Sequence, residues 1–190
     1  MPDYSELTLS TSRLQLRPLL HADADALLVV HADGDVMRYT TIPPWKSLDQ
    51  AHALIERDLK GMPAGRYLCL GIVPTCEGQV VGTCTLFGFN QASRRAEIGF
   101  VLGRSAWGKG YMSEALRALL DYGFSSLDLN RVEADTDPRN LAAAKMLERL
   151  GFAKEGHLRE RWIVGDEKSD TALYGLLKGD WARPVSPVGK

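Results

Sequence analysis

The chain has 190 residues, and its 23 Lys and Arg against 24 Asp and Glu give a formal net charge of -1. This balance excludes the strong positive field that draws many proteins to nucleic acid or to anionic membranes. A hydrophobic content of 45% with 25% charged residues is typical of a globular chain with one buried core. We expect a single domain over 1–182 and a loose tail over 183–190, which is rich in proline and small residues.

The N-terminal segment has neither the basic start nor the apolar stretch of a secretory signal. The longest uncharged apolar stretch, 67–76, is far shorter than the ~20 residues of a membrane span. We therefore expect a cytoplasmic protein that does not enter a membrane. Cys69, Cys76 and Cys84 form no CxxC pair and have no histidine at metal-ligand spacing, so we expect reduced thiols within strands and no metal site.

The first third of the chain alternates strand and helix signals. Leucines that alternate with polar residues predict strand character over 7–16, and a helical pattern follows over 23–31. Two prolines predict a loop over 39–45, because proline blocks both helix and ladder hydrogen bonds. Ser47 opens an S-x-x-Q capping box, which predicts a helix that reaches about residue 60.

Strands dominate the remainder, and two helices interrupt them. A glycine-rich turn that starts at Gly103 leads into an amphipathic helix, which ends near Phe124. Asp137 is predicted to cap a second helix, which Gly151 ends. This order predicts an α+β or α/β fold on a mixed sheet with about four helices. The predicted strands are 66–73, 79–89, 95–102, 132–136, 158–164 and 171–177.

The loop between the strand that ends at residue 102 and the following helix carries the clearest chemical signal. Gly108 and Gly110 have no Cβ to obstruct the approach of a ligand to successive main-chain N–H groups. The N-terminus of the helix adds about half a positive charge. This combination predicts an anion site suited to phosphate or diphosphate, with Lys109 at its rim.

The same loop allows two other interpretations. Gly103, Gly108 and Lys109 match G-x-x-x-x-G-K, the start of the phosphate-binding loop of nucleotide triphosphatases. The next residue is Gly110, which has no hydroxyl to bind Mg²⁺, so a nucleotide-binding protein of this kind is a remote alternative. A glycine turn whose only role is to start the helix is the other alternative.

Four motifs follow one another along the chain: 97–100 (EIGF), 107–112 (WGKGYM), Asn140 and 147–152 (LERLGF). Their order and spacing resemble the GNAT N-acetyltransferases, and most of all the branch with the ribosomal-protein acetyltransferases RimJ and RimL. The opening TSRLQLRPL and the ending LRERWIVGDEKSDTALYGLL resemble the same branch, so the likeness covers nearly the whole chain. The resemblance implies an α/β sandwich with a mostly antiparallel sheet of about seven strands, and a splay between the fourth and the fifth.

The resemblance also implies the cofactor, acetyl-CoA, and the residues that hold it. In the family, a loop Q/R-x-x-G-x-G/A binds the diphosphate through main-chain N–H groups, and the strand before it pairs with the pantetheine arm. Asn140 is implied to contact the cofactor, although a polar residue in the first turn of a helix is an equally simple interpretation. The implied loop residues are Trp107, Gly108, Lys109, Gly110, Tyr111 and Met112, and the implied strand residues are Phe100, Val101 and Leu102. Trp107 and Met112 depart from the family pattern, which binding through main-chain groups tolerates.

Glu97 is the predicted general base. An amine must lose a proton to attack a thioester, and a base within reach lowers that barrier. On a strand, Glu97 shares a face with Gly99, which leaves room beside it, and the resemblance implies a glutamate in this role. Glu160 is the second candidate, and a surface ion pair with Arg94 or Arg95 is the alternative for Glu97.

Two family positions lack their usual groups. Leu147 stands where many members have a tyrosine that protonates the leaving thiolate, and Ala143 replaces a serine used by others. The proton donor is therefore unassigned, and a CoA-binding regulatory domain without catalysis stays open as an alternative. We expect direct transfer in a ternary complex, and a main-chain N–H near Val101 or Leu102 is predicted to stabilise the charge on the acyl oxygen.

The acceptor is expected to be a primary amine, either a protein N-terminal α-amine, such as that of a ribosomal protein, or a small molecule. Tyr39, Trp45, Arg159 and Trp162 are predicted to line its site. Core packing of Trp45 and ion pairing of Arg159 are the alternatives. No nucleic-acid partner is expected, and both a monomer and a homodimer are open.

Overall fold

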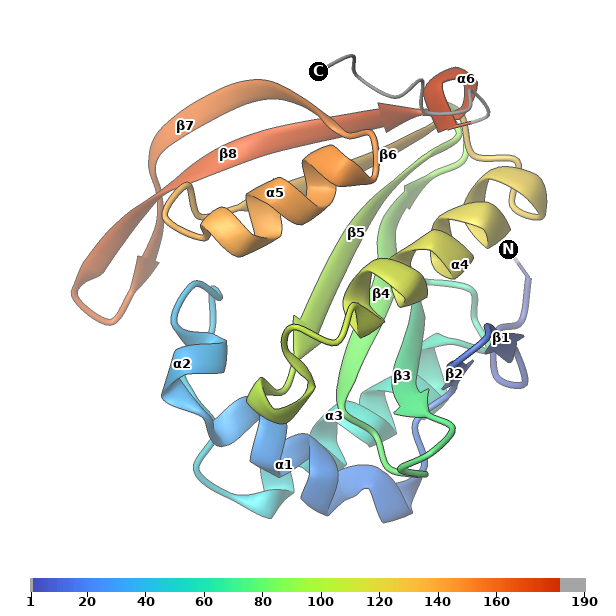
Figure 1. Ribbon diagram of the computed structural model, residues 1–190, viewed down its shortest axis with the longest axis vertical. Coiled ribbons are helices and arrows are strands. Elements are labelled where there is room, and N and C mark those ends of the chain that lie inside the picture. Colours follow the sequence, from blue (N-terminus) through green and yellow to red (C-terminus); the bar gives the residue numbers. More distant parts are fainter. Residues whose placement is uncertain (1, 182–190) are drawn as a thin grey trace.

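The structure is a computed structural model that describes residues 2–181. The end of the predicted domain at residue 182 and the predicted tail over 183–190 lie outside the described residues. One sheet of eight strands, in the order β1-β2-β3-β4-β5-β6-β8-β7, forms the centre of the fold. Figure 1 shows α4 and α5 in front of this sheet and α3 behind it. The predicted α+β sandwich is confirmed, with eight strands in place of about seven.

The predicted elements are found with shifted ends, and two short helices, 34–37 and 178–181, are present in addition to the about four that were predicted. The strands are β1 (Leu9–Ser10), β2 (Leu14–Arg17), β3 (Leu68–Pro74), β4 (Gly82–Asn90), β5 (Arg95–Leu102), β6 (Arg131–Thr136), β7 (Ala153–Val164) and β8 (Glu167–Leu177). The helices are η1 (His21–Asp23), α1 (Ala24–Ala32), α2 (Gly34–Met37), α3 (Leu48–Gly61), η2 (Arg104–Ala106), α4 (Tyr111–Ser125), α5 (Leu141–Arg149) and α6 (Lys178–Trp181).

Three local predictions need correction. The strand predicted over 7–16 is two short strands, because a turn at 11–13 separates β1 from β2. The cap of α5 is Asn140 instead of Asp137, since the Asn140 side chain accepts a hydrogen bond from Ala143 N. Cys76 is exposed in a turn and lies in no strand, whereas the other two cysteines are buried.

Strands β5 and β6 create the opening that organises the site. They are the parallel pair of the sheet, and they pair only from Arg95 to Glu97 on β5 and from Arg131 to Glu133 on β6. Beyond Glu97, β5 stays paired with β4 while β6 continues beside β8, so the two strands diverge. The predicted splay between the strands over 95–102 and 132–136 is therefore confirmed (Figure 1).

Helix α4 packs its apolar face against the sheet over β2 and β4, and so fixes the position of the loop that precedes it. Leu116, Leu119 and Leu120 are fully buried. Gly123 lies against Leu86 of β4, and Leu86 is directly opposite Ile98 of β5. Because side chains alternate along a strand, Ile98 faces α4 and its neighbour Glu97 faces the other side of the sheet.

Candidate active site

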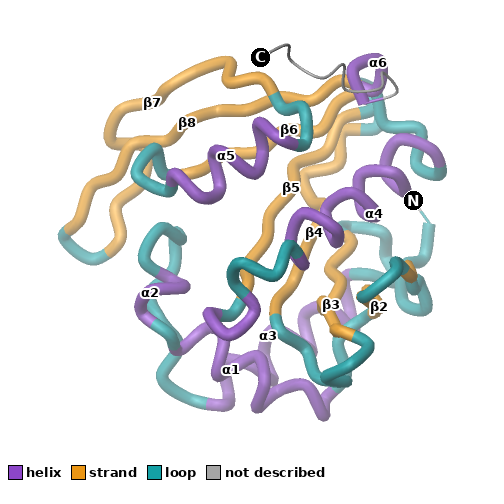
Figure 2. The backbone as a smooth tube through the Cα atoms, viewed as in Figure 1, coloured by secondary structure: helices purple, strands orange, loops and turns teal. Residues whose placement is uncertain are grey.

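The loop that joins β5 to α4 adopts backbone conformations that glycine permits most easily. Gly108 and Gly110 have φ angles of 74° and 78°. These angles lie in the left-handed region, which other residues enter at a cost. A Cβ added at Gly108 would meet nothing within 4 Å, so this side of the loop is open. Figure 2 shows the loop running from the end of β5 into the first turn of α4.

The open loop presents hydrogen-bond donors without partners. Among the residues that the structure describes, none accepts a hydrogen bond from the main-chain N–H groups of 108–113. Three of these groups, at Tyr111, Met112 and Ser113, begin α4, where the helix dipole adds positive potential. Successive free donors at the N-terminus of a helix fit a diphosphate, which is the group of acetyl-CoA predicted to bind here.

Trp107 ties the loop to the end of β5. Its indole Nε1 donates a hydrogen bond to the carbonyl of Leu102 at 2.7 Å. Gly103 N donates to Val81 O at 2.8 Å, so Gly103 N–H points away from the splay and the Leu102 carbonyl points toward it. Strand alternation then directs the main-chain groups of Phe100 toward the splay as well, and those of Val101 toward β4. Phe100 and Leu102 thus offer main-chain groups to a ligand in the splay, and Val101 does not.

The other predicted loop residues differ in what their side chains offer. Tyr111 and Met112 are buried, so only their main-chain groups are accessible to a diphosphate. Lys109 Nζ lies 3.1 Å from Glu77 Oε1, and this hydrogen bond raises the pKa of the Lys109 ammonium. Lys109 therefore remains protonated at the rim, but Glu77 neutralises part of its charge.

Glu97 lies where the splay begins, on the face of the sheet away from α4. Its side chain is 41% exposed, and its carboxylate Oε1 lies 4.0 Å from Arg95 Nη1. Arg95 is bound more closely by Glu133. Arg94, the other partner considered for a surface ion pair, binds Asp128 instead. Glu97 thus keeps a carboxylate oxygen available to a substrate amine, directly or through one water.

Glu160 has a different environment. It lies on β7 at a register break between Leu158 and Trp162, with a φ of 47°. Its carboxylate accepts a hydrogen bond from Lys168 Nζ at 2.7 Å, and its main-chain N–H donates to Asp170 Oδ1. Glu160 is therefore engaged by a cation, and its geometry supports the role of base less well than that of Glu97.

Asn140 lies at the start of α5, just after β6. Its Oδ1 is used to cap the helix, which leaves its amide NH₂ as the side-chain group available for a ligand. Ala143 and Leu147 of α5 are buried, and since their side chains are hydrocarbons neither position offers a proton donor.

A cavity of about 200 Å³ lies between the segment after α2 and the β7–β8 hairpin. Tyr39, which was predicted to line the acceptor site, lines this cavity. Two guanidinium groups approach the Tyr39 ring, Arg38 at 5.4 Å and Arg139 at 5.9 Å. Arg139 binds Asp137 at 2.6 Å and Glu167 at 2.6 Å. The hydrogen bond from Arg139 lowers the pKa of the Asp137 carboxyl.

The remaining predicted acceptor residues do not line this cavity. Trp45 stacks on His31 with ring centroids 4.0 Å apart and packs against the core, which is the alternative considered for it. Arg159 and Trp162 are exposed on β7, and the hairpin contributes residues nearer its tip instead. The sequence analysis did not single out Arg38, Arg139 and Glu167, which line the cavity beside Tyr39, because no motif marks them and only the fold brings them together.

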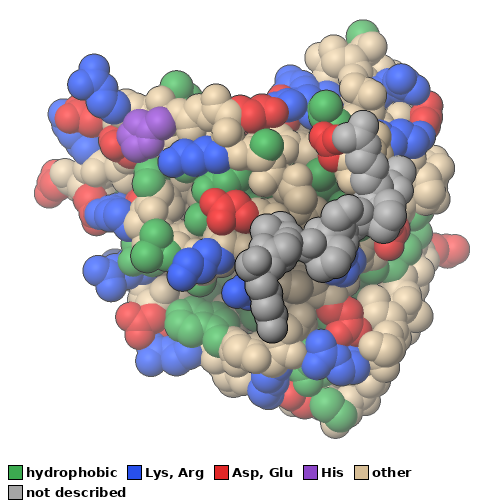
Figure 3. Space-filling view, turned by 45° about the horizontal axis from the view of Figure 1, so that its top comes forward, with side chains coloured by type: hydrophobic (Ala, Val, Ile, Leu, Met, Phe, Trp, Pro, Cys, Tyr) green, Lys and Arg blue, Asp and Glu red, His purple; other side chains and the backbone are tan. Residues whose placement is uncertain are grey.

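The face drawn in Figure 3 carries charges of both signs. Figure 3 shows Lys and Arg interspersed with Asp and Glu over the face in view, as the near-zero net charge predicts. Within residues 2–181, no helix combines the length and apolar character needed to cross a bilayer.

Comparison with known proteins identifies the family. Residues 13–153 match the model of the acetyltransferase (GNAT) domain. The uncharacterized N-acetyltransferase p20 of Bacillus licheniformis is 39% identical over 92% of this chain and 98% of its own length. The spermidine N(1)-acetyltransferase of Escherichia coli K12 is 27% identical over 83% of this chain and 82% of its own length.

The solved structures lead to the same fold. The spermidine N-acetyltransferase from Vibrio cholerae, solved in complex with CoA and spermine, superposes with a TM-score of 0.80 at 23% identity and covers 91% of this chain and 100% of its own. A GNAT-family acetyltransferase from Bacillus anthracis also gives a TM-score of 0.80, at 24% identity, over 91% and 99% of the two chains. With its splayed sheet and its loop of free N–H groups, this chain belongs to the GNAT family and is an acetyl-CoA-dependent N-acetyltransferase.

Proposed function

We propose that the protein transfers an acetyl group directly from acetyl-CoA to a primary amine while both substrates are bound. The observation that carries this proposal is the splay between β5 and β6. The diphosphate loop lies at the end of β5 on one side of the splay, and Glu97 lies where the splay begins. Bound acetyl-CoA supplies the acetyl group as a thioester: the C–S bond breaks as the amine forms a C–N bond, the amine loses a proton and the thiolate gains one.

The chain's own residues then have distinct roles. The N–H groups of 108–112 hold the diphosphate, and the main-chain groups of Phe100 and Leu102 face the acyl end of the cofactor. An N–H in the splay stabilises negative charge that develops on the acyl oxygen. Glu97 accepts the proton of the amine, directly or through a water. Since no nucleophilic side chain is activated at the splay, no covalent enzyme intermediate is needed.

The first candidate acceptor is an α-amine at a protein or peptide N-terminus. An α-amino group has a pKa near ~8 and an alkylammonium near ~10.4, so a carboxylate base deprotonates the α-amine with a smaller penalty. The open face along β7, which is exposed over most of its length, has room for an extended chain. Small polyamines are the second candidate, because spermidine acetyltransferases are among the relatives.

A release assay tests both parts of the proposal. Free CoA thiol is measured with acetyl-CoA and, in separate reactions, N-terminal peptides, spermidine, amino acids and aminoglycosides. We expect thiol release that depends on the amine, with peptides ahead of spermidine. Tight CoA binding without release for any amine would instead support the regulatory domain, and spermidine ahead of peptides would reverse the acceptor assignment.

A further inference from the structure

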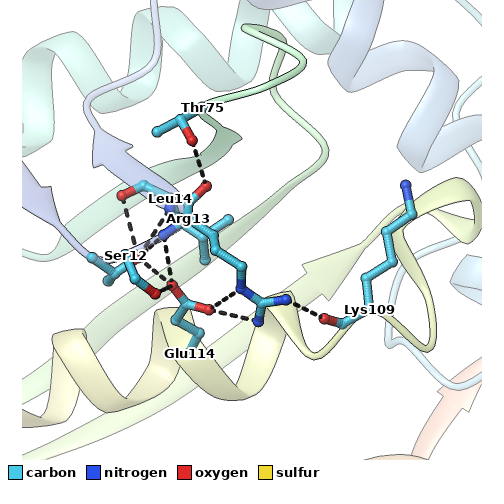
Figure 4. A network of polar contacts seen from close by, with 7 residues as sticks. Ser12, Arg13, Leu14, Thr75, Lys109 and Glu114 are labelled. Atoms are coloured by element: carbon cyan, nitrogen blue, oxygen red, sulfur yellow. Dashed lines mark hydrogen bonds and ion pairs between the residues drawn. The ribbon is translucent and has the colours of Figure 1, made fainter.

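Behind the diphosphate loop, a polar network joins the beginning of the chain to α4 (Figure 4). Glu114, in the first turns of α4, accepts hydrogen bonds from Thr11 Oγ1 at 2.6 Å and Ser12 Oγ at 3.1 Å. It also accepts from Arg13 N at 3.0 Å and Arg13 Nε at 2.7 Å. All these donors lie in the turn between β1 and β2, so one carboxylate fastens that turn to the helix.

Arg13 also reaches the main chain of the loop. Its Nη1 donates a hydrogen bond to Lys109 O at 2.9 Å. The peptide between Lys109 and Gly110 is planar and trans, so the Gly110 N–H points away from the Lys109 carbonyl. By holding that carbonyl from behind, Arg13 directs the Gly110 N–H toward the open side of the loop.

Arg13 is itself held on several sides. Thr75 donates to Arg13 O through its main-chain N at 2.9 Å and through Oγ1 at 3.2 Å. The guanidinium lies 5.1 Å from the centroid of the Tyr111 ring. A Cβ added at Gly110 would approach Arg13 Nη2 to 3.4 Å, so the loop and the guanidinium are already in close contact. This fixation makes the Lys109 peptide a rigid part of the site.

The positive charge of Arg13 balances the negative charge of Glu114 near the N-terminus of α4. A carboxylate near the N-terminus of α4 repels an anion bound at the same end unless a cation accompanies it. Arg13 Nη2 lies 2.6 Å from Glu114 Oε2. Burial alone raises the pKa of Glu114, but the hydrogen bonds from Thr11, Arg13 and Ser12 together outweigh it and leave the pKa below its usual value. The carboxylate therefore stays ionised, and its charge is balanced.

We propose that Arg13 and Glu114 form a loop clamp that preorganises the diphosphate loop and thereby raises the affinity for acetyl-CoA. Both are positioning residues, because they act through the Lys109 peptide and touch no reacting atom. A loop that is already ordered binds without the cost of ordering its donors. This inference rests on the proposed function, since it takes 107–112 as the diphosphate site.

The test compares two thioesters in the purified full-length protein. Acetyl-CoA carries the diphosphate and S-acetyl-pantetheine lacks it, and the dissociation constant of each is measured by calorimetry or NMR titration. For Arg13→Gln we expect the constant for acetyl-CoA to rise about tenfold, as for the loss of hydrogen bonds from a charged donor. The constant for S-acetyl-pantetheine should not change, whereas a general loss of structure would weaken both ligands.

Arg57→Gln is the matched control. Arg57 is 61% exposed, binds Asp58 at 3.0 Å and lies 5.2 Å from the Tyr67 ring, so it has the same kinds of partner on the remote helix α3. We expect both dissociation constants to stay at their wild-type values in this variant. Glu114→Gln added to Arg13→Gln should weaken acetyl-CoA binding by less than the sum of the single effects, because the two residues act as a unit.

An unchanged affinity for acetyl-CoA in Arg13→Gln overturns the loop clamp, and so does an equal loss for both thioesters. If that variant fails to fold, Arg13→Lys is judged by the same criteria, since it keeps the charge but cannot bridge a carbonyl and a carboxylate. Gly110→Asp distinguishes an error in the loop clamp from an error in the proposed diphosphate site. If Gly110→Asp binds acetyl-CoA normally, the diphosphate assignment is wrong; if only Gly110→Asp loses binding, the loop clamp alone is wrong.

Discussion

The cofactor side and the acceptor side of the splay are built on different chemistry. On the cofactor side, the available groups are main-chain donors over 108–113, and side chains such as Trp107 and Arg13 serve to hold the loop. On the proposed acceptor side, the groups around Tyr39 are side chains that pair with one another, and they come from segments far apart in the chain. Main-chain binding is insensitive to side-chain identity, so it suits a constant ligand, whereas paired side chains can be exchanged to suit different amines.

Of the substitutions considered, Gly110→Asp should weaken acetyl-CoA binding most strongly. The substitution places a carboxylate among donors that face the diphosphate and forces an unfavourable φ, so we expect the dissociation constant of acetyl-CoA to rise about a thousandfold. Calorimetry on folded protein measures it. Gly165→Asp is the control, because Gly165 has a φ of 61° and open space around it but lies in the β7–β8 turn. Equal effects of both substitutions would show that backbone strain, not the anion site, is responsible.

Glu97→Gln should lower the rate of acetyl transfer without changing the affinity for acetyl-CoA. Loss of a general base lowers kcat by about a hundredfold, while the affinity for acetyl-CoA stays unchanged because Glu97 lies outside the loop. A wild-type rate in this variant, together with a loss in Glu160→Gln, would move the role to Glu160.

Buried His31 links the stability of the fold to pH. Burial lowers the pKa of His31 to about 4, and neither ring nitrogen has a partner among the described residues. In the unfolded chain His31 binds a proton below pH ~6.5. As the pH falls from ~6.5 toward the pKa of His31 in the folded protein, proton binding stabilises the unfolded state relative to the folded one. We expect the free energy of unfolding to fall by about 2 kcal/mol from pH 7 to pH 5 through this group.

Urea unfolding at both pH values tests this expectation with His31→Phe. The variant keeps an aromatic ring against Trp45 but cannot titrate. Its free energy of unfolding should change less between pH 7 and pH 5 than that of the wild type, by the amount assigned to His31. The same pH dependence in both proteins would show that His31 is protonated in the folded state at no cost.

Arg139→Gln should weaken the binding of the acceptor but not that of acetyl-CoA. Without Arg139, Asp137 and Glu167 lose the cation between them and the Tyr39 ring loses a neighbour, so we expect the KM of the acceptor to rise about fivefold, or about 1 kcal/mol. The affinity for acetyl-CoA should not change. Arg159→Gln provides the comparison, because Arg159 was predicted from the sequence but does not line the cavity. A larger effect of Arg159→Gln would relocate the acceptor site to β7.

Much of the cofactor side could be predicted from the sequence because its determinants are local. Gly108, Gly110 and the apolar spacing of α4 lie within a few residues of one another, and each sets backbone geometry directly. The cap of α5 shows the limit of this reasoning: Asp137 and Asn140 are both good caps, and the choice of Asn140 leaves Asp137 free to bind Arg139. The residues of the proposed acceptor cavity have no local signature, so Arg139 and Glu167 were not predicted.

The sequence by itself determined the strands, the long helices, the glycine loop and the family, since periodicity, caps and motifs are properties of short segments. Only the tertiary structure decided where β5 and β6 part, that Trp45 stacks on His31, and that Arg13 meets Glu114 across 101 residues of chain. These arrangements depend on which distant surfaces pack together, and packing is a collective result of the whole core.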